Sequence, residues 1–114
     1  MRPVRKTFPA NLLIEGTTAL VVGGGRVGLR KTKALLEAGA AVRLVCPEAV
    51  ADFDELPVER VTRCFVPDDV AGCRLVFACT DDKHTNRAVL AAARAKGVAC
   101  CCADGNWAEG DFIV

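Results

Sequence analysis

The fold is decided by the stretch Thr18-Ala19-Leu20-Val21-Val22-Gly23-Gly24-Gly25-Arg26-Val27-Gly28. A β-branched apolar run reaches three glycines there, and a helix-like pattern begins directly after them. Gly23, Gly25 and Gly28 fit the spacing G-x-G-x-x-G between a strand and a helix, the context in which this spacing has meaning. Gly23 permits the tight turn, Gly25 lets a pyrophosphate approach the backbone, and Gly28 lets the helix pack closely on the strand.

The start of the predicted helix strengthens this expectation. Backbone N–H groups in the first turn of a helix have no partner within the helix, and the positive end of the helix dipole faces the same way. Both features attract phosphate groups. Together with the glycines, Arg26 and Val27 at the helix start therefore predict a binding site for a dinucleotide such as NAD.

Length and composition indicate one α/β domain. A chain of 114 residues can bury a core without disulfides. A hydrophobic fraction of 52% with only 5% aromatic residues favours α/β layering over an aromatic-rich β-sandwich. We therefore treat residues 1–114 as a single NAD-binding domain.

Charge and hydropathy argue against two classes of partner. The net charge of +1 gives no reason to expect nucleic acid or a membrane surface as a partner. No apolar stretch approaches the roughly 20 residues that cross a bilayer, and no signal-peptide core follows the basic N-terminus. A cytoplasmic location is the expectation.

The seven cysteines do not form a recognisable framework. Their number is odd and no C-x-x-C pair occurs, so neither a disulfide scaffold nor a metal site is expected. Cys100, Cys101 and Cys102 fall in a predicted strand, in which Cys101 points away from the other two. Most of these thiols are expected to behave as small buried hydrophobes.

Strands and helices alternate along the chain. Strands are predicted at residues 17–22, 41–45, 58–65, 75–79 and 98–103, with short further strands at 8–14 and 112–114. Helices are predicted at 26–38, ending at Gly39, at 48–54 after Pro47, and from a cap at Thr80 or Asp81 to residue 96, ending at Gly97. This alternation predicts a doubly wound parallel sheet in the order 3-2-1-4-5, a Rossmann-like fold.

Ligands of such sheets bind beyond the carboxyl ends of the strands. Four elements should therefore meet around one crevice. They are the glycine turn, Cys46-Pro47-Glu48, Thr80-Asp81-Asp82 and Asp104-Gly105-Asn106.

The second of these elements departs from the usual pattern. An acidic residue at the end of the second strand commonly binds the adenosine ribose, but Cys46 occupies that place here and Glu48 follows it. Glu48 either reaches the ribose or favours the N-terminus of its own short helix. Both readings stay open, and so does the choice between NAD and NADP, for which Arg43 is a strand-borne phosphate partner.

The third and fourth elements also allow two readings each. Thr80 and Asp81 either cap the following helix or line the ribose and nicotinamide end of the cofactor, with Asn86 one turn further on. Asp104 either accepts a proton from a bound substrate or stabilises an Asp-Gly turn. His84, the only histidine, is expected to be exposed and incidental.

Taken together, these motifs resemble the N-terminal domain of the siroheme synthase and precorrin-2 dehydrogenase family. The resemblance is carried by residues 20–28, Arg30-Lys31, 35–40, Val45-Cys46-Pro47-Glu48, Ala78-Cys79-Thr80-Asp81-Asp82 with Asn86, Ala103-Asp104 and Phe112-Ile113. It implies NAD-dependent oxidation of the tetrapyrrole precorrin-2 to sirohydrochlorin, with ferrous iron inserted by some members. It also implies that Asp104 is catalytic and that Arg26, Arg30 and Lys31 contact the substrate's carboxylates.

The sequence departs from this family at two places. Members usually carry Asn where this chain has Cys101. The family continues beyond Phe112-Ile113 into a dimerisation region, which forms a homodimer, and a helical tail; this chain does not include them. The alternative function is a nucleotide-sensing regulatory module that binds NAD without catalysis, although such modules favour an acid where Cys46 stands.

Overall fold

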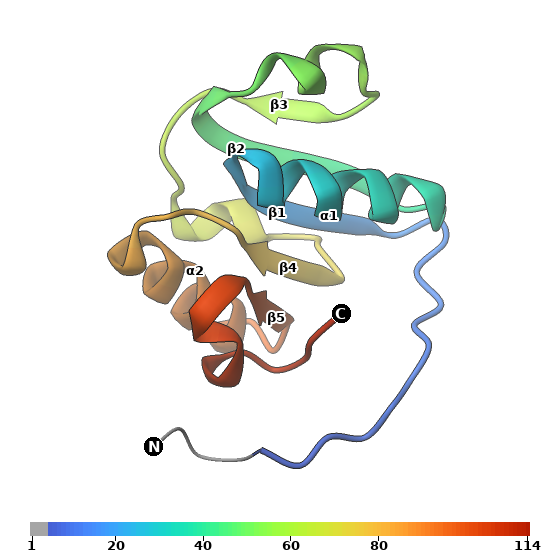
Figure 1. The fold of residues 1–114 in the computed structure, drawn as a ribbon, viewed down its shortest axis with the longest axis vertical. Helices are drawn as coiled ribbons and strands as arrows, with labels where there is room; N and C mark the ends of the chain where they lie inside the picture. Colours follow the sequence, from blue (N-terminus) through green and yellow to red (C-terminus); the bar gives the residue numbers. More distant parts are fainter. Residues whose placement is uncertain (1–4) are drawn as a thin grey trace.

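Five parallel strands form one sheet in the order β3-β2-β1-β4-β5 (Figure 1). The structure, a computed structural model, describes residues 5–114 apart from the side chains of residues 104–106. The strands are β1 (Thr18–Gly24), β2 (Ala41–Ala49), β3 (Glu59–Val61), β4 (Leu75–Ala78) and β5 (Ala99–Cys102). The α-helices are α1 (Arg26–Glu37) and α2 (Lys83–Ala95), and three short 3-10 helices are η1 (Ala51–Glu55), η2 (Pro67–Val70) and η3 (Asp104–Glu109). The predicted α/β fold and strand order are confirmed.

The two α-helices lie on opposite faces of the sheet, so the core has two layers. Helix α1 packs on β1 and β2, while α2 packs on β4 and β5. Side chains of β1 alternate between these layers: Val21 is buried on the α1 side, whereas Leu20 and Val22 are buried on the α2 side. Burial on both faces is why this strand is continuously apolar.

The cysteine triplet follows the same alternation. Cys101 packs with the α1-side cluster, and Cys100 and Cys102 pack with the α2-side cluster, as predicted. Burial is the main cause that raises the pKa of all three thiols. These thiols therefore stay protonated and act as small core residues.

Two predicted terminal strands are wrong. Residues 8–14 and 112–114 form no strand. Phe8 and Leu13 are each 91% exposed, so the N-terminal segment has no buried face that would fix a strand register. Phe112 instead packs edge-on against Phe77 of β4, with 5.5 Å between ring centroids.

The end of β2 also differs from the prediction. Pro47 and Glu48 belong to β2, and the short helix begins only at Ala51, so Pro47 does not start it. Val22 pairs with Val45 and Gly24 pairs with Ala49, which leaves the intervening part of β2 as a bulge. Proline is tolerated at a bulge because no ladder hydrogen bond is needed there.

Three smaller boundaries complete the comparison. β3 has only three residues and pairs with β2 alone, so the predicted edge strand is confirmed but shorter. The cap of α2 is Asp82 rather than Thr80 or Asp81. Gly39 and Gly97 follow the two helices with φ of 85° and 71°, which confirms both as helix stops. No helix in residues 5–114 is long and apolar enough to cross a membrane.

Candidate functional site

A cleft of about 800 Å³ opens at the carboxyl edge of the sheet. Four segments line it: residues 22–27 of the glycine turn, 45–50 at the end of β2, 64–65 after β3, and 79–82 with Thr85 at the start of α2. Every predicted cofactor-binding residue except Gly28 lines this cleft. Three of the four segments that were predicted to meet at this edge therefore do so, whereas the side chains of the fourth, residues 104–106, lie outside the described residues.

Close packing explains two of the three motif glycines. Gly23 has φ of 127°, and a Cβ there would lie 2.5 Å from the carbonyl oxygen of Cys79. A Cβ on Gly28 would overlap the carbonyl oxygen of Gly23. Gly28 thus lies beneath the turn and brings α1 close to β1, which is the task its position in the motif predicts.

Gly25 is different because its surroundings are open. Apart from atoms of residues 24–26, no described atom lies within 4 Å of the position that a Cβ would take on this residue. Gly25 is also the N-cap of α1 and has no side chain to bond the first N–H groups of the helix. This leaves a cradle of backbone donors, at the positive end of the helix dipole, that fits a phosphate.

Gly24 is a site residue that the motif did not reveal. A Cβ on Gly24 would overlap the carbonyl oxygen of Glu48, and it would lie 2.6 Å from the Cα of Ala49. The Val50 N–H also donates to the Gly24 carbonyl at 2.8 Å. The glycine turn is therefore fastened to the bulged end of β2, and the only signal for Gly24 in the sequence was its place as the middle of three consecutive glycines.

The bulge decides one question about Glu48. This residue lies in β2, so it does not begin a helix, and the acids in the first turn of η1 are Asp52 and Asp54. Burial is also the main cause that raises the pKa of the Cys46 thiol beside it. An exposed carboxylate and a buried, protonated thiol therefore occupy the end of β2.

An ion pair joins the first residue of α1 to η1. Arg26 Nη1 lies 2.9 Å from Asp52 Oδ2, with the two side chains 70% and 48% exposed. Such an exposed pair contributes little stability. It does engage the Arg26 guanidinium with a carboxylate, and no sequence signal indicated Asp52.

Asn86 holds the loop after β4 in place. Its side chain is buried, its Oδ1 accepts from the Thr80 N–H at 3.1 Å and from the Thr80 hydroxyl at 2.7 Å, and its Nδ2 donates to the Thr80 carbonyl at 2.9 Å. Thr80 is thereby fixed beside the cleft, with Asp81 exposed next to it. Asn86 serves this loop rather than facing the cleft.

Asp82 caps α2. It accepts from the Thr85 hydroxyl at 2.9 Å and from the His84 N–H at 3.0 Å. These two bonds, that of Thr85 first, are the main causes that lower the pKa of Asp82. His84 itself is exposed, as expected.

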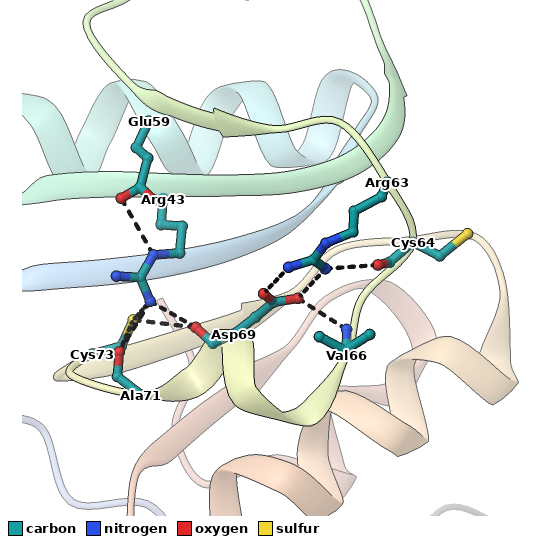
Figure 2. Close-up of polar contacts among 8 residues, drawn as sticks. All are labelled: Arg43, Glu59, Arg63, Cys64, Val66, Asp69, Ala71 and Cys73. Carbon is teal, nitrogen blue, oxygen red and sulfur yellow. Dashed lines mark hydrogen bonds and ion pairs between the residues drawn. The ribbon is translucent and has the colours of Figure 1, made fainter.

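Arg43 is engaged away from the cleft. It donates to Glu59 at 3.3 Å and to the backbone carbonyls of Asp69 and Ala71 at 2.8 and 3.0 Å (Figure 2). These bonds tie η2 to β2. The structure therefore does not support Arg43 as a phosphate partner.

The other predicted contacts are dispersed. Asp104 begins η3 directly after β5, but its side chain lies outside the described residues. Arg30 is exposed on α1, and Lys31 lines a second cavity of about 750 Å³ on the α1 side, away from the glycine turn. Among the side chains that the structure describes, no group of three is arranged to hold a metal ion.

The chain was compared with known proteins. Residues 10–114 match the family NAD_binding_7, whose description reads "Putative NAD(P)-binding". Siroheme synthase of Chromobacterium violaceum is 40% identical over 95 residues, which cover 80% of this chain and 20% of that protein. Siroheme synthase of Pseudomonas entomophila is 43% identical over 89 residues, which cover 75% of this chain and 19% of that protein.

A solved structure gives the same relationship. "SirC, precorrin-2 dehydrogenase" matches with a TM-score of 0.69 and 26% identity, covering 73% of this chain and 44% of that chain. The chain spans about a fifth of the length of the curated relatives. The matched family and this dehydrogenase both indicate a nicotinamide cofactor. The chain therefore belongs to this NAD(P)-binding family, that of the siroheme synthase N-terminal domain and precorrin-2 dehydrogenase.

Proposed function

We propose that this chain is the NAD-binding domain of an enzyme that oxidises precorrin-2 to sirohydrochlorin in siroheme biosynthesis. Support comes from its relatives, which include siroheme synthases and a precorrin-2 dehydrogenase. The observation that carries the proposal is the open cradle at Gly25, which adjoins a cleft of about 800 Å³. That volume lies in the range of small-molecule and cofactor sites.

Three groups of lining residues correspond to three parts of the cofactor. The pyrophosphate lies on the backbone of Gly23, Gly25, Arg26 and Val27, while Gly28 keeps α1 close beneath it. The adenosine ribose lies at the end of β2, beside Cys46, Pro47 and Glu48. Thr80 and Asp81 border the half that carries the nicotinamide.

Charge at the end of β2 favours NAD over NADP. Glu48 presents an exposed carboxylate there, which can accept hydrogen bonds from ribose hydroxyls but repels a 2′-phosphate. Arg26, the cation of the turn, is paired with Asp52. A 2′-phosphate would therefore meet one carboxylate and an arginine that already has a partner.

The reaction removes a hydride and a proton from precorrin-2. When NAD is bound, its nicotinamide would supply the hydride acceptor. Asp104, placed directly after β5 at the cofactor edge, takes the proton. Its role rests on that position and on the family resemblance.

A spectroscopic assay tests the proposal. Precorrin-2 and NAD are added to the protein, and NADH formation is followed, with a full-length siroheme synthase as positive control and NADP in parallel. The proposal expects NADH that depends on precorrin-2, and a slower reaction with NADP. Binding of NAD without any NADH formation would favour the nucleotide-sensing module instead.

A further inference from the structure

The wall of the cleft beyond β2 comes from the segment of residues 62–66, between β3 and η2. Cys64 and Phe65 of this segment line the cleft opposite the end of β2. β3 ends at Val61 after three residues, so no strand pairing reaches this segment. Phe65 packs against the α2-side core, and a polar interaction is needed to hold the rest of this wall.

Arg63 and Asp69 provide that interaction. Arg63 Nη2 lies 2.7 Å from Asp69 Oδ1, and Nη1 lies 2.9 Å from Oδ2, which is a bidentate pair (Figure 2). Arg63 Nη1 also donates to the Cys64 carbonyl at 3.0 Å, and Asp69 Oδ2 accepts from the Val66 N–H at 2.9 Å. These bonds close a ring around Cys64 and Phe65 and fix both ends of the wall.

The carboxylate end of this ring is anchored to the sheet. The Asp69 side chain is 6% exposed, and Val70 next to it is fully buried in the α2-side core. Arg43 of β2 bonds the backbone carbonyls of Asp69 and Ala71 from the other side (Figure 2). The ring of hydrogen bonds therefore fixes residues 62–66, which have no strand partner, relative to the sheet.

The chemistry of this part of the cleft indicates which half of the cofactor it meets. With the pyrophosphate at the glycine turn and the adenosine ribose at the end of β2, the base lies beyond β2. Val45, Pro47 and Phe65 line the cleft there. An apolar wall that includes an aromatic ring suits a flat heteroaromatic base.

We propose that Arg63 and Asp69 are a positioning pair, which holds Cys64 and Phe65 where the adenine of the bound dinucleotide packs. This inference rests on the proposed function, because it needs the dinucleotide in the cleft. Neither residue of the pair touches the reacting atoms. Their effect is on affinity for the adenosine half of the cofactor.

Three substitutions test the pair. Arg63→Gln removes the charge, Arg63→Lys keeps the charge but loses the bidentate geometry, and Arg94→Gln is the control. Arg94, in the last turn of α2 at the opposite end of this helix from the cleft, is similarly exposed and pairs with Asp111. Calorimetry measures the Kd of each variant for NAD, AMP and nicotinamide mononucleotide, and the Tm of each variant is recorded.

The expected result separates the two halves of the cofactor. Arg63→Gln weakens NAD and AMP by roughly tenfold, the size of one lost charge-assisted bond, and leaves nicotinamide mononucleotide unchanged. Arg63→Lys restores only part of the affinity, and Arg94→Gln changes none of the three Kd values. A merely structural role would instead lower the Tm and weaken all three ligands together.

Cys64 supplies an independent readout. It is exposed, whereas the other six cysteines are buried, so iodoacetamide should alkylate Cys64 first. NAD and AMP should protect this thiol and nicotinamide mononucleotide should not, and Cys64→Ser should remove the label. In Arg63→Gln, AMP protection should require correspondingly higher AMP concentrations.

The outcomes distinguish this inference from the proposed function. If the wild type binds NAD and AMP but Arg63→Gln binds both equally well, the positioning pair is refuted and the proposed function stands. The same holds if AMP leaves Cys64 unprotected. If the wild type binds no dinucleotide at all, the proposed function fails and the inference falls with it.

Discussion

The side chain of Asn86 makes three hydrogen bonds to Thr80, six residues before it. One turn of α2 thereby fixes the loop that follows β4 at the carboxyl edge of the sheet. Because Asn86 is only 6% exposed, water cannot easily replace these bonds. The geometry of the cleft beside Thr80 thus depends on a residue behind the loop.

Replacing Asn86 by Ala should therefore affect stability and binding together. The substitution leaves the N–H and carbonyl of Thr80 without their partners, which should lower the free energy of unfolding by about 1–3 kcal/mol. Urea unfolding measures this change, and calorimetry should show weaker NAD binding. Arg87→Ala, at the exposed next position of α2, is the control and should change neither. Full NAD affinity in Asn86→Ala would show that the loop needs no such support.

Gly28→Ala should destabilise the protein more than Gly25→Ala, which changes only the N-cap of α1. The new methyl group would overlap the Gly23 carbonyl in the first case and meet open space in the second. Overpacking of this kind costs about 1–3 kcal/mol. Chemical denaturation of both variants makes the comparison, and equal stability of the two would contradict the packing role of Gly28.

Acid should weaken the wall after β3. Arg63 is the main cause that lowers the pKa of Asp69 below its ordinary value of 3.8, with the Val66 N–H and the charge of Arg43 adding to the effect. A lowered folded-state pKa means that the stabilisation is fully present above the unfolded pKa and is lost as pH falls through the folded-state pKa. The free energy of unfolding should therefore fall with pH below about pH 4, and it should fall less steeply in Asp69→Asn. An identical pH dependence in the two proteins would remove Asp69 from this role.

Asp104→Asn should separate binding from turnover. The amide cannot take a proton from precorrin-2, but it is nearly the same size and leaves the glycine turn untouched. NAD affinity should remain at the wild-type value while precorrin-2-dependent NADH formation is largely lost. Turnover at the wild-type rate would exclude Asp104 as the proton acceptor.

Local sequence signals predicted the framework of the fold. The four consecutive apolar residues Leu75–Ala78 are all buried, and the glycine turn lies between β1 and α1, so both signals had a direct structural cause. The strand order followed from right-handed crossovers between parallel strands. The strand order in turn predicted that the cleft lies at the carboxyl edge of the sheet.

The sequence failed where tertiary contacts override local preference. Pro47 reads as a helix start, but pairing of Gly24 with Ala49 draws Pro47 into a bulge of β2. Asp82 displaces Thr80 as the cap because Asn86 already engages Thr80. Neither event can be read from spacing.

The Arg63–Asp69 pair is likewise set by tertiary contacts and could not be predicted from the sequence. Nothing in its spacing distinguishes it from other charges on the surface, and its meaning depends on where η2 docks on the sheet. Asp52 likewise meets Arg26 only because the end of β2 folds back towards the glycine turn. Long-range positions, rather than residue types, were the missing information.

The most direct test of the account is calorimetric titration of NAD into the wild type and Gly25→Val. The valine side chain enters the space that the pyrophosphate needs, while no described protein atom outside residues 24–26 lies within 4 Å of its Cβ. We predict that the wild type binds one NAD per chain and that Gly25→Val binds none while it still unfolds cooperatively, with a Tm lowered only slightly because valine is a poorer N-cap than glycine. Equal NAD affinity in both proteins would show that the glycine turn does not hold the cofactor.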